Sequence, residues 1–298
     1  MPITPTGPES PVTIKDLFYE FQTQPFYKKL KPGTQEVYET AFKRTSKLHN
    51  VKLSELKRSK IKRVIDEYVE RPGIQSKIIS FYSRIISYAF DMDYIPVNVM
   101  ARYPRPKLGS HKRVNQEKLK TIISAGDTVV TDLVTLLYNT GLRISDALAL
   151  KMSAWDEAEN VLRDKSIKTG EEVALEISDD LRALLQRRKS EGAGPDDYVL
   201  HLSSSTTNTS SARYNFVYAR WHKALTSVGL NAKRITFHGI RKDMACRIIE
   251  GGGTDLHVQS VLGHSDIRQS AEYRKEAARR HIAKEALSLV NKTGTENK

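Results

Sequence analysis

Cysteine is almost absent from this chain of 298 residues, which contains only Cys246. One thiol cannot form an internal disulfide, and it cannot supply the several thiolates of a structural zinc site. The composition therefore predicts a protein of a reducing compartment that binds no metal through cysteine.

Long hydrophobic runs are also missing. No stretch approaches the roughly 20 apolar residues of a membrane-spanning helix, so we expect no membrane partner. The first residues, MPITPTGPESP, have neither the basic start nor the apolar run of a signal peptide. Their four prolines predict a disordered lead over residues 1–11. We expect the protein in the cytoplasm.

Acidic residues are too few to balance the basic ones. The chain has 35 Asp and Glu against 48 Lys and Arg, which gives a net charge of +13. Such a balance suits a polyanionic partner, and double-stranded DNA is the first candidate. A basic protein that is merely soluble has the same composition, so charge alone leaves both interpretations open.

Length and a hydrophobic content of 39% predict two domains. Over residues 12–102 the apolar residues recur with a helical period in four segments, the second beginning at a Thr34 N-cap. Four amphipathic helices predict a small bundle.

Residues 11–110 hold 19 Lys and Arg against 10 Asp and Glu, an excess of nine positive charges. We expect DNA contact here, although a solvated helix face gives the same pattern. The densest basic run is Lys57, Arg58, Lys60, Lys62 and Arg63.

Residues 103–113 are predicted as an extended linker that follows DNA phosphates, because prolines and a glycine alternate there with basic side chains. The basic residues in and next to it are Arg102, Arg105, Lys107, Lys112 and Arg113.

The second domain, residues 114–275, is predicted to be mainly α with a small β-sheet. Strands are expected at 161–162 and 173–177, around a turn that carries Lys168. Helices are expected at 115–125, 132–139, 144–150, 181–189, 214–228, 241–250, 255–262 and 271–290. Residues 276–298 are expected to form a C-terminal helix and tail.

Transfer of a phosphodiester to an enzyme hydroxyl needs a nucleophile, cations around the phosphate oxygens and a proton donor for the leaving oxygen. Gly141 is predicted to end one helix and to place Arg143 at the start of the next, facing a cleft. Asp146, three residues later on the same face, is expected to hydrogen-bond and orient the Arg143 guanidinium.

Two further clusters supply the remaining groups. His238 and Arg241 share one face of a helix start, where backbone N–H groups also favour an anion. His264 precedes Tyr273 by nine residues, so a turn or helix brings both near one phosphate. Each residue alone is more often structural, and a zinc site on the histidines is disfavoured because no cysteine or carboxylate motif accompanies them.

At these residues the chain resembles the tyrosine recombinase, or phage integrase, family over about residues 114–273. The family pattern is Arg, Lys, His-x-x-Arg, His or Trp, and Tyr, in this order. It matches Arg143, Lys168, His238, Arg241, His264 and Tyr273. The resemblance implies an α-rich tyrosine recombinase catalytic domain behind a helical core-binding domain.

The resemblance implies that Tyr273 attacks a DNA phosphate to form a 3′-phosphotyrosyl intermediate without any metal or nucleotide cofactor. Arg143, Arg241 and His264 would stabilise the transition state, Lys168 would protonate the leaving oxygen, and His238 would accept the tyrosine proton or fix the phosphate. Recombination of two duplexes implies a homotetramer on DNA.

The C-terminal helix is expected either to dock in a neighbouring subunit or to pack on its own domain, and the sequence leaves both open. Its apolar stripe consists of Ala277, Ile282, Ala286, Leu287 and Leu289.

Arg274 and Lys275 follow Tyr273 where chromosome-dimer resolvases of the family usually carry Thr-His, so an integrase of a phage or genomic island is favoured. The short stretch before the first helix predicts that no arm-binding domain precedes it. The alternatives are a type IB topoisomerase and a catalytically silent DNA-binding regulator.

Overall fold

The structure, a computed structural model, describes residues 11–168, 170–203, 209–232, 234–263 and 266. It divides into two units, Met1–Ser110 and His111–Lys298, which we describe separately. The division falls inside the segment 103–113 that the sequence predicts as a linker, and this segment contains neither helix nor strand.

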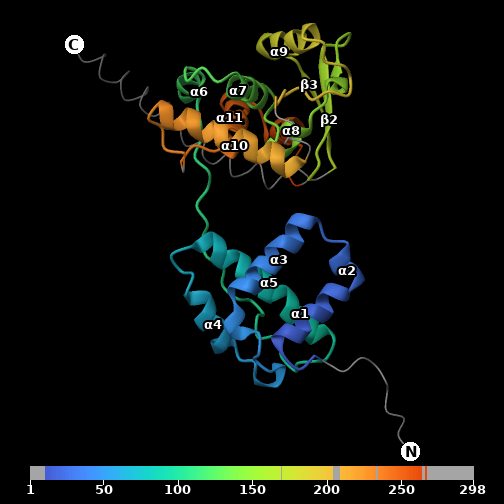
Figure 1. Cartoon of the computed structure of the whole chain (residues 1–298), viewed down its shortest axis with the longest axis vertical. Coiled ribbons are helices and arrows are strands. Elements are labelled where there is room, and N and C mark those ends of the chain that lie inside the picture. The colour runs from blue at the N-terminus through green and yellow to red at the C-terminus, as the bar shows by residue number, and fades with distance from the viewer. Residues whose placement is uncertain (1–10, 169, 204–208, 233, 264–265, 267–298) are drawn as a thin grey trace, which may run out of the picture. The chain divides into compact units, whose positions relative to one another are not determined.

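The first unit is a helical bundle around an aromatic core (Figure 1). Its elements are α1 (Ile14–Thr23), α2 (Pro25–Lys28), α3 (Pro32–Arg44), two 3₁₀ turns (Ser46–Leu48 and Leu53–Glu55), α4 (Arg58–Asp66) and α5 (Pro72–Asp91). The rings of Phe18 and Phe81 meet edge to face with their centroids 5.2 Å apart. The buried Tyr82 hydroxyl in this core is satisfied by a neighbour, since it donates to Thr45 Oγ1 over 2.8 Å.

Local signals determine where these helices begin. Thr13 and Asp16 form a reciprocal capping box at the start of α1. The expected N-cap at Thr34 is wrong, because α3 begins at Pro32 after Lys31. Proline has its φ angle preset for the first helical turn and needs no partner for a backbone N–H there, so it starts the helix earlier than a threonine cap would.

The second unit is mainly helical with a small antiparallel sheet, as predicted. Its helices are α6 (Gln116–Ile123), α7 (Thr128–Thr140), α8 (Ile144–Ala149), α9 (Asp179–Ser190), α10 (Ser210–Ser227), α11 (Phe237–Glu250) and α12 (Asp255–Leu262). Figure 1 shows the sheet beside α9, at one side of the other helices.

The sheet contains three strands in the order β1-β2-β3. The two predicted strands correspond to β2 (Val161–Lys165) and β3 (Glu172–Glu176), in a register that pairs Leu162 with Leu175. β1 (Trp155–Asp156) was not predicted, because two residues are too few to show alternation.

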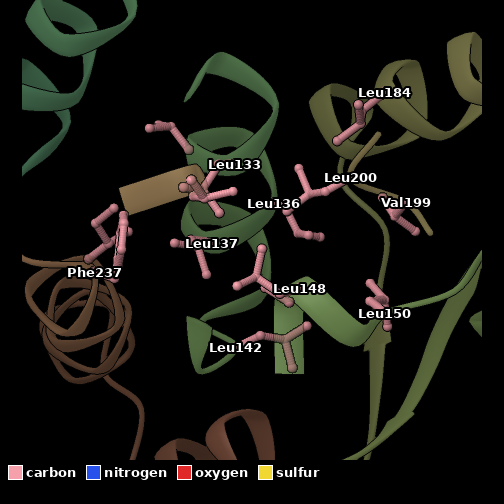
Figure 2. Close-up of a cluster of buried hydrophobic side chains, with 14 of the residues drawn as sticks. Leu133, Leu136, Leu137, Leu142, Leu148, Leu150, Leu184, Val199, Leu200 and Phe237 are labelled. Carbon is pink, nitrogen blue, oxygen red and sulfur yellow. The ribbon is translucent and has the colours of Figure 1, made fainter. Parts of the chain in front are cut away.

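Helix α7 lies at the centre of the second core. Leu133, Leu136 and Leu137 are fully or almost fully buried. In Figure 2 leucines of α7 lie between Phe237 of α11 on one side and Leu184 of α9 on the other. The apolar period of α7 thus packs it against α11, the helix that carries His238 and Arg241.

Across the described residues, no helix combines the length and the apolar character that crossing a membrane requires.

The substitution Leu136→Ala should lower the free energy of unfolding of the second unit by about 2–5 kcal/mol, because it removes a fully buried side chain and leaves a cavity. Both tryptophans of the chain, Trp155 and Trp221, belong to this unit, so their fluorescence in a urea titration reports its unfolding. Leu256 is 65% exposed, and Leu256→Ala should change stability by less than about 0.5 kcal/mol. Equal losses in the two variants would contradict the central position of α7.

Candidate active site

Gly141 sets the direction of the chain into the site. It ends α7 in the left-handed conformation, with φ +65°, and its N–H donates to Leu137 O over 2.9 Å. A Cβ at this position would lie 2.5 Å from Leu262 Cδ2 and 3.0 Å from Met244 Cγ. Glycine is therefore required here both by conformation and by the close approach of α11 and α12.

Arg143 is the N-cap residue of α8, and 17% of its side chain is exposed. Its Nη1 lies 3.9 Å from Asp146 Oδ2, an ion-pair distance that is too long for a hydrogen bond. The bonds run instead through Ser166, whose Oγ accepts from Arg143 Nη1 over 3.1 Å and donates to Asp146 Oδ2 over 3.3 Å. The expected direct hydrogen bond is thus wrong, because a buried hydroxyl lies between the two groups.

The other oxygen of Asp146 holds the β2–β3 turn. Asp146 Oδ1 accepts from Ile167 N over 3.1 Å, and Gly170 N closes the turn by donating to Ser166 O over 2.8 Å. Lys168 lies in this turn and is exposed. One buried carboxylate therefore fastens both Arg143 and the turn that carries Lys168.

Arg241 lies on α11 with only 3% of its surface exposed. Its Nη1 donates to Gly141 O over 2.8 Å, and its Nη2 donates to Leu262 O over 2.5 Å. Both carbonyls lie at the C-terminal ends of helices, where the helix dipole favours a cation. Arg241 thereby links Gly141, two residues before Arg143, to Leu262, two residues before His264.

His238 lies in the first turn of α11, which Thr236 caps by accepting from Gly239 N over 3.2 Å. The residue is exposed at the surface, but its imidazole is partly buried by the groups around it and contacts that of His111 at a centroid distance of 4.6 Å. Burial of the ring, and next electrostatic repulsion by nearby basic groups, lower the pKa of His238 to about 4. These groups are His111, Arg241, Arg143 and Lys242. His238 is therefore neutral at pH 7 and can accept a proton.

Three residues around the site were not predicted from the sequence: His111, Ser166 and Lys242. Lys242 is only 4% exposed, although a lysine in a helix is usually solvated. Ser166 lies 20 residues from Asp146, and no local pattern indicates such a contact. The pairing of His111 with His238, 127 residues apart, likewise depends on the tertiary fold.

His264 and Tyr273 lie outside the described residues. α12 ends at Leu262, and Gly263 adopts the left-handed conformation with φ +57°. The described chain thus reaches the residue before His264 at a point fixed by Arg241, and the assignment of Tyr273 as nucleophile stays a prediction.

The basic run of the first unit lies on and next to α4. Lys57, Arg58, Lys62 and Arg63 are exposed, and Lys60 is half-buried. Some of these charges have acidic neighbours: Lys60 Nζ lies 3.3 Å from Glu55, and Lys62 pairs with Asp66. Surface pairs of this kind contribute little free energy, so they leave the lysines able to exchange partners.

The basic residues near the linker divide into two groups. Arg102, Lys107 and Lys112 are exposed, and the exposed Arg105 donates from Nη1 to Ser80 Oγ over 2.8 Å. Arg113 is different, because its Nε lies 2.6 Å from Asp243 and its Nη2 lies 2.9 Å from Glu250. The geometry therefore favours a structural role for Arg113 over the expected DNA contact.

The described residues contain no group of three or more His, Cys, Asp or Glu side chains arranged to hold a metal ion. The groups that do converge are cations and a neutral imidazole, which together suit an anion.

The imidazole signal of His238 in an NMR titration of the DNA-free protein should have its midpoint near pH 4. The unfolded chain takes up this proton near the ordinary value of about 6.5, so the free energy of unfolding should fall as the pH is lowered through that window. The substitution His238→Gln identifies the signal by its loss. A midpoint near the ordinary value would contradict the crowding of cations around this ring.

Comparisons with known proteins agree on one family. A model described as the phage integrase family matches residues 112–280. Tyrosine recombinase XerA of Saccharolobus solfataricus is 25% identical over 71% of this chain and 67% of its own length. Tyrosine recombinase XerD of Caulobacter vibrioides is 28% identical over 64% of this chain. The match covers 62% of the length of that relative.

A solved structure with the same fold is a lambda integrase tetramer bound to a Holliday junction. It aligns with a TM-score of 0.72 at 20% identity, over 86% of this chain and 78% of that one. The family match covers more than half of the chain, including every residue of the predicted signature. This chain therefore belongs to the phage integrase family of tyrosine site-specific recombinases.

Proposed function

We propose that this protein cuts and rejoins double-stranded DNA through a 3′-phosphotyrosyl bond to Tyr273. The observation that carries the proposal is the convergence of Arg143, Arg241 and a neutral His238, with the turn of Lys168 fastened to the same network. An arrangement of two guanidiniums and one uncharged imidazole fits a phosphodiester that must be held and attacked.

The two arginines would act on the charge of the phosphate. Arg143 is partly exposed and can donate to a non-bridging oxygen, whereas the buried Arg241 contributes a charge that water screens little. His264 would add a third donor. Each donor aimed at developing charge is typically worth about 3 kcal/mol of transition-state stabilisation.

Proton transfers complete the step. Tyr273 Oη attacks phosphorus and gives its proton to His238, while the bond from phosphorus to the 5′ oxygen breaks and Lys168 protonates that oxygen. A phenol has an ordinary pKa of about 10, so the surrounding cations also make its ionised form accessible. The free 5′-hydroxyl can later attack in reverse, which conserves the bond energy without ATP.

The partners follow from the same reaction. The exposed basic run of α4 and the exposed basic residues near the linker would contact DNA phosphates. Exchange between two duplexes needs four cuts, and a solved lambda integrase is a tetramer on a Holliday junction, which supports a homotetramer here. The apolar stripe that contains Ile282 and Leu287 would dock in a neighbouring subunit.

The biological context we propose is integration or excision of a phage or genomic island. Because its substrate would be DNA, we expect the protein at the nucleoid within the cytoplasm. A type IB topoisomerase and a catalytically silent regulator remain distinct outcomes of the following experiment.

Incubation of the protein with a nicked suicide substrate that carries its cognate site should trap a covalent complex, and Tyr273→Phe should abolish it. The matched control is Tyr218→Phe, which removes the hydroxyl of an exposed tyrosine of α10 and should trap the complex as the wild type does. A covalent complex with Tyr273→Phe would refute the assigned nucleophile. No complex with any form would indicate a regulator, and relaxation of arbitrary plasmid without site exchange would indicate a topoisomerase.

The substitution Asp146→Asn should slow formation of the covalent complex by about 100-fold, because misplacement of a positioned group by about 1 Å has an effect of that size. DNA binding should change little, since Asp146 is buried and its partners are within the protein. Gel-based cleavage rates and DNA-binding titrations measure the two effects, and the exposed Asp196 provides a matched control in Asp196→Asn. Equal rates for both variants would contradict the positioning role of Asp146.

A further inference from the structure

The chain enters the second unit across the N-terminus of α11. Over the 111–114 segment, Val114 is buried and its N–H donates to Gly239 O over 3.1 Å. Arg113 is anchored farther along the same helix by its pairs with Asp243, in the middle of α11, and Glu250, at its end. The segment is thus fixed to the helix that carries His238 and Arg241.

Gly239 shows how closely this segment approaches. A Cβ at this position would lie 2.4 Å from Lys112 O and 2.7 Å from Val114 Cγ2. The φ angle of Gly239 is not positive, so the glycine is required by space and not by backbone conformation. The 111–114 segment therefore occupies the space that a side chain at position 239 would need, and only glycine fits there.

His111 is the residue of this segment that reaches the site. Its Nδ1 lies 3.1 Å from Thr236 Oγ1, and its ring is tilted 54° to that of His238. Thr236 Oγ1 already accepts from Gly239 N, so its own proton is suited to donate to Nδ1 of a His111 tautomer protonated on Nε2. The cap of α11, His111 and His238 form one connected group.

We propose that His111 is a positioning residue for His238, so that the 111–114 segment sets the orientation and the protonation state of the imidazole at the phosphate site. The inference rests on the role proposed for His238 as proton acceptor. It deepens that role, because it adds a residue that the motif of the family does not contain.

Two effects of His111 support this role. The ring contact limits the orientations that the exposed His238 side chain can adopt. Among the groups that face His238, His111 follows burial as the largest cause of its lowered pKa, ahead of Arg241, Arg143 and Lys242. It therefore helps keep the imidazole neutral and able to take the proton of the nucleophile.

The test is His111→Ala in the full-length protein, with the rate of covalent complex formation on the suicide substrate measured against pH. The acidic limb of this profile should move upward by about one pH unit, which is the size expected when one neighbouring basic group is removed. The rate at pH 7 should fall about ten-fold, while the DNA dissociation constant changes less than about two-fold. The NMR midpoint of His238 in the DNA-free protein should rise by about the same one unit.

Two further variants make the result decisive. Gly239→Ala displaces the 111–114 segment without changing an ionisable group, and it should move the acidic limb in the same direction. His201→Ala removes another exposed histidine of the same unit and should behave as the wild type.

The inference is overturned if the wild type forms the complex while His111→Ala matches His201→Ala in rate, acidic limb and His238 midpoint. Failure of the proposed function looks different, because then the wild type traps no complex at any pH. The NMR midpoint of His238 still decides whether His111 acts on it.

Discussion

The buried guanidinium of Arg241 is the group on which the arrangement of the site depends. A buried charge is unfavourable unless hydrogen bonds satisfy it, and here two carbonyls at helix ends do so, Gly141 O and Leu262 O. The same two bonds tie together the chain ahead of Arg143 and the chain ahead of His264. Loss of this cation would leave both carbonyls without their donor and release two of the segments that surround the phosphate site.

Asp146 fixes the Arg143 side chain and the β2–β3 turn within the site. Its two oxygens reach Arg143 through Ser166 and the β2–β3 turn through the N–H of Ile167. Charges placed before the reaction need no reorganisation during it, which is the main source of electrostatic stabilisation in enzymes. The cost of gathering cations appears at His238, whose pKa is lowered by burial and by its neighbours.

The sequence was sufficient for the parts of the fold that local rules control. Helical periodicity located the helices, and the order of signature residues identified the family, because both are written along the chain. Contacts between distant segments were not predictable in the same way. Asp146 was expected to hold Arg143 directly, since i, i+3 spacing shows neighbours on a helix but not a hydroxyl inserted from a strand end. Arg113 was expected on DNA, because nothing in a basic linker shows that it folds back onto Asp243.

Gly239 has a consequence for relatives of this protein. A side chain between the histidine and the arginine of the motif is incompatible with the route that the chain takes past Lys112 O and Val114. A relative with alanine or a larger residue there must bring its interdomain connection in by another course. The identity of one small position inside the motif is therefore a marker, readable in an alignment, of the route by which the chain of each member enters its catalytic domain.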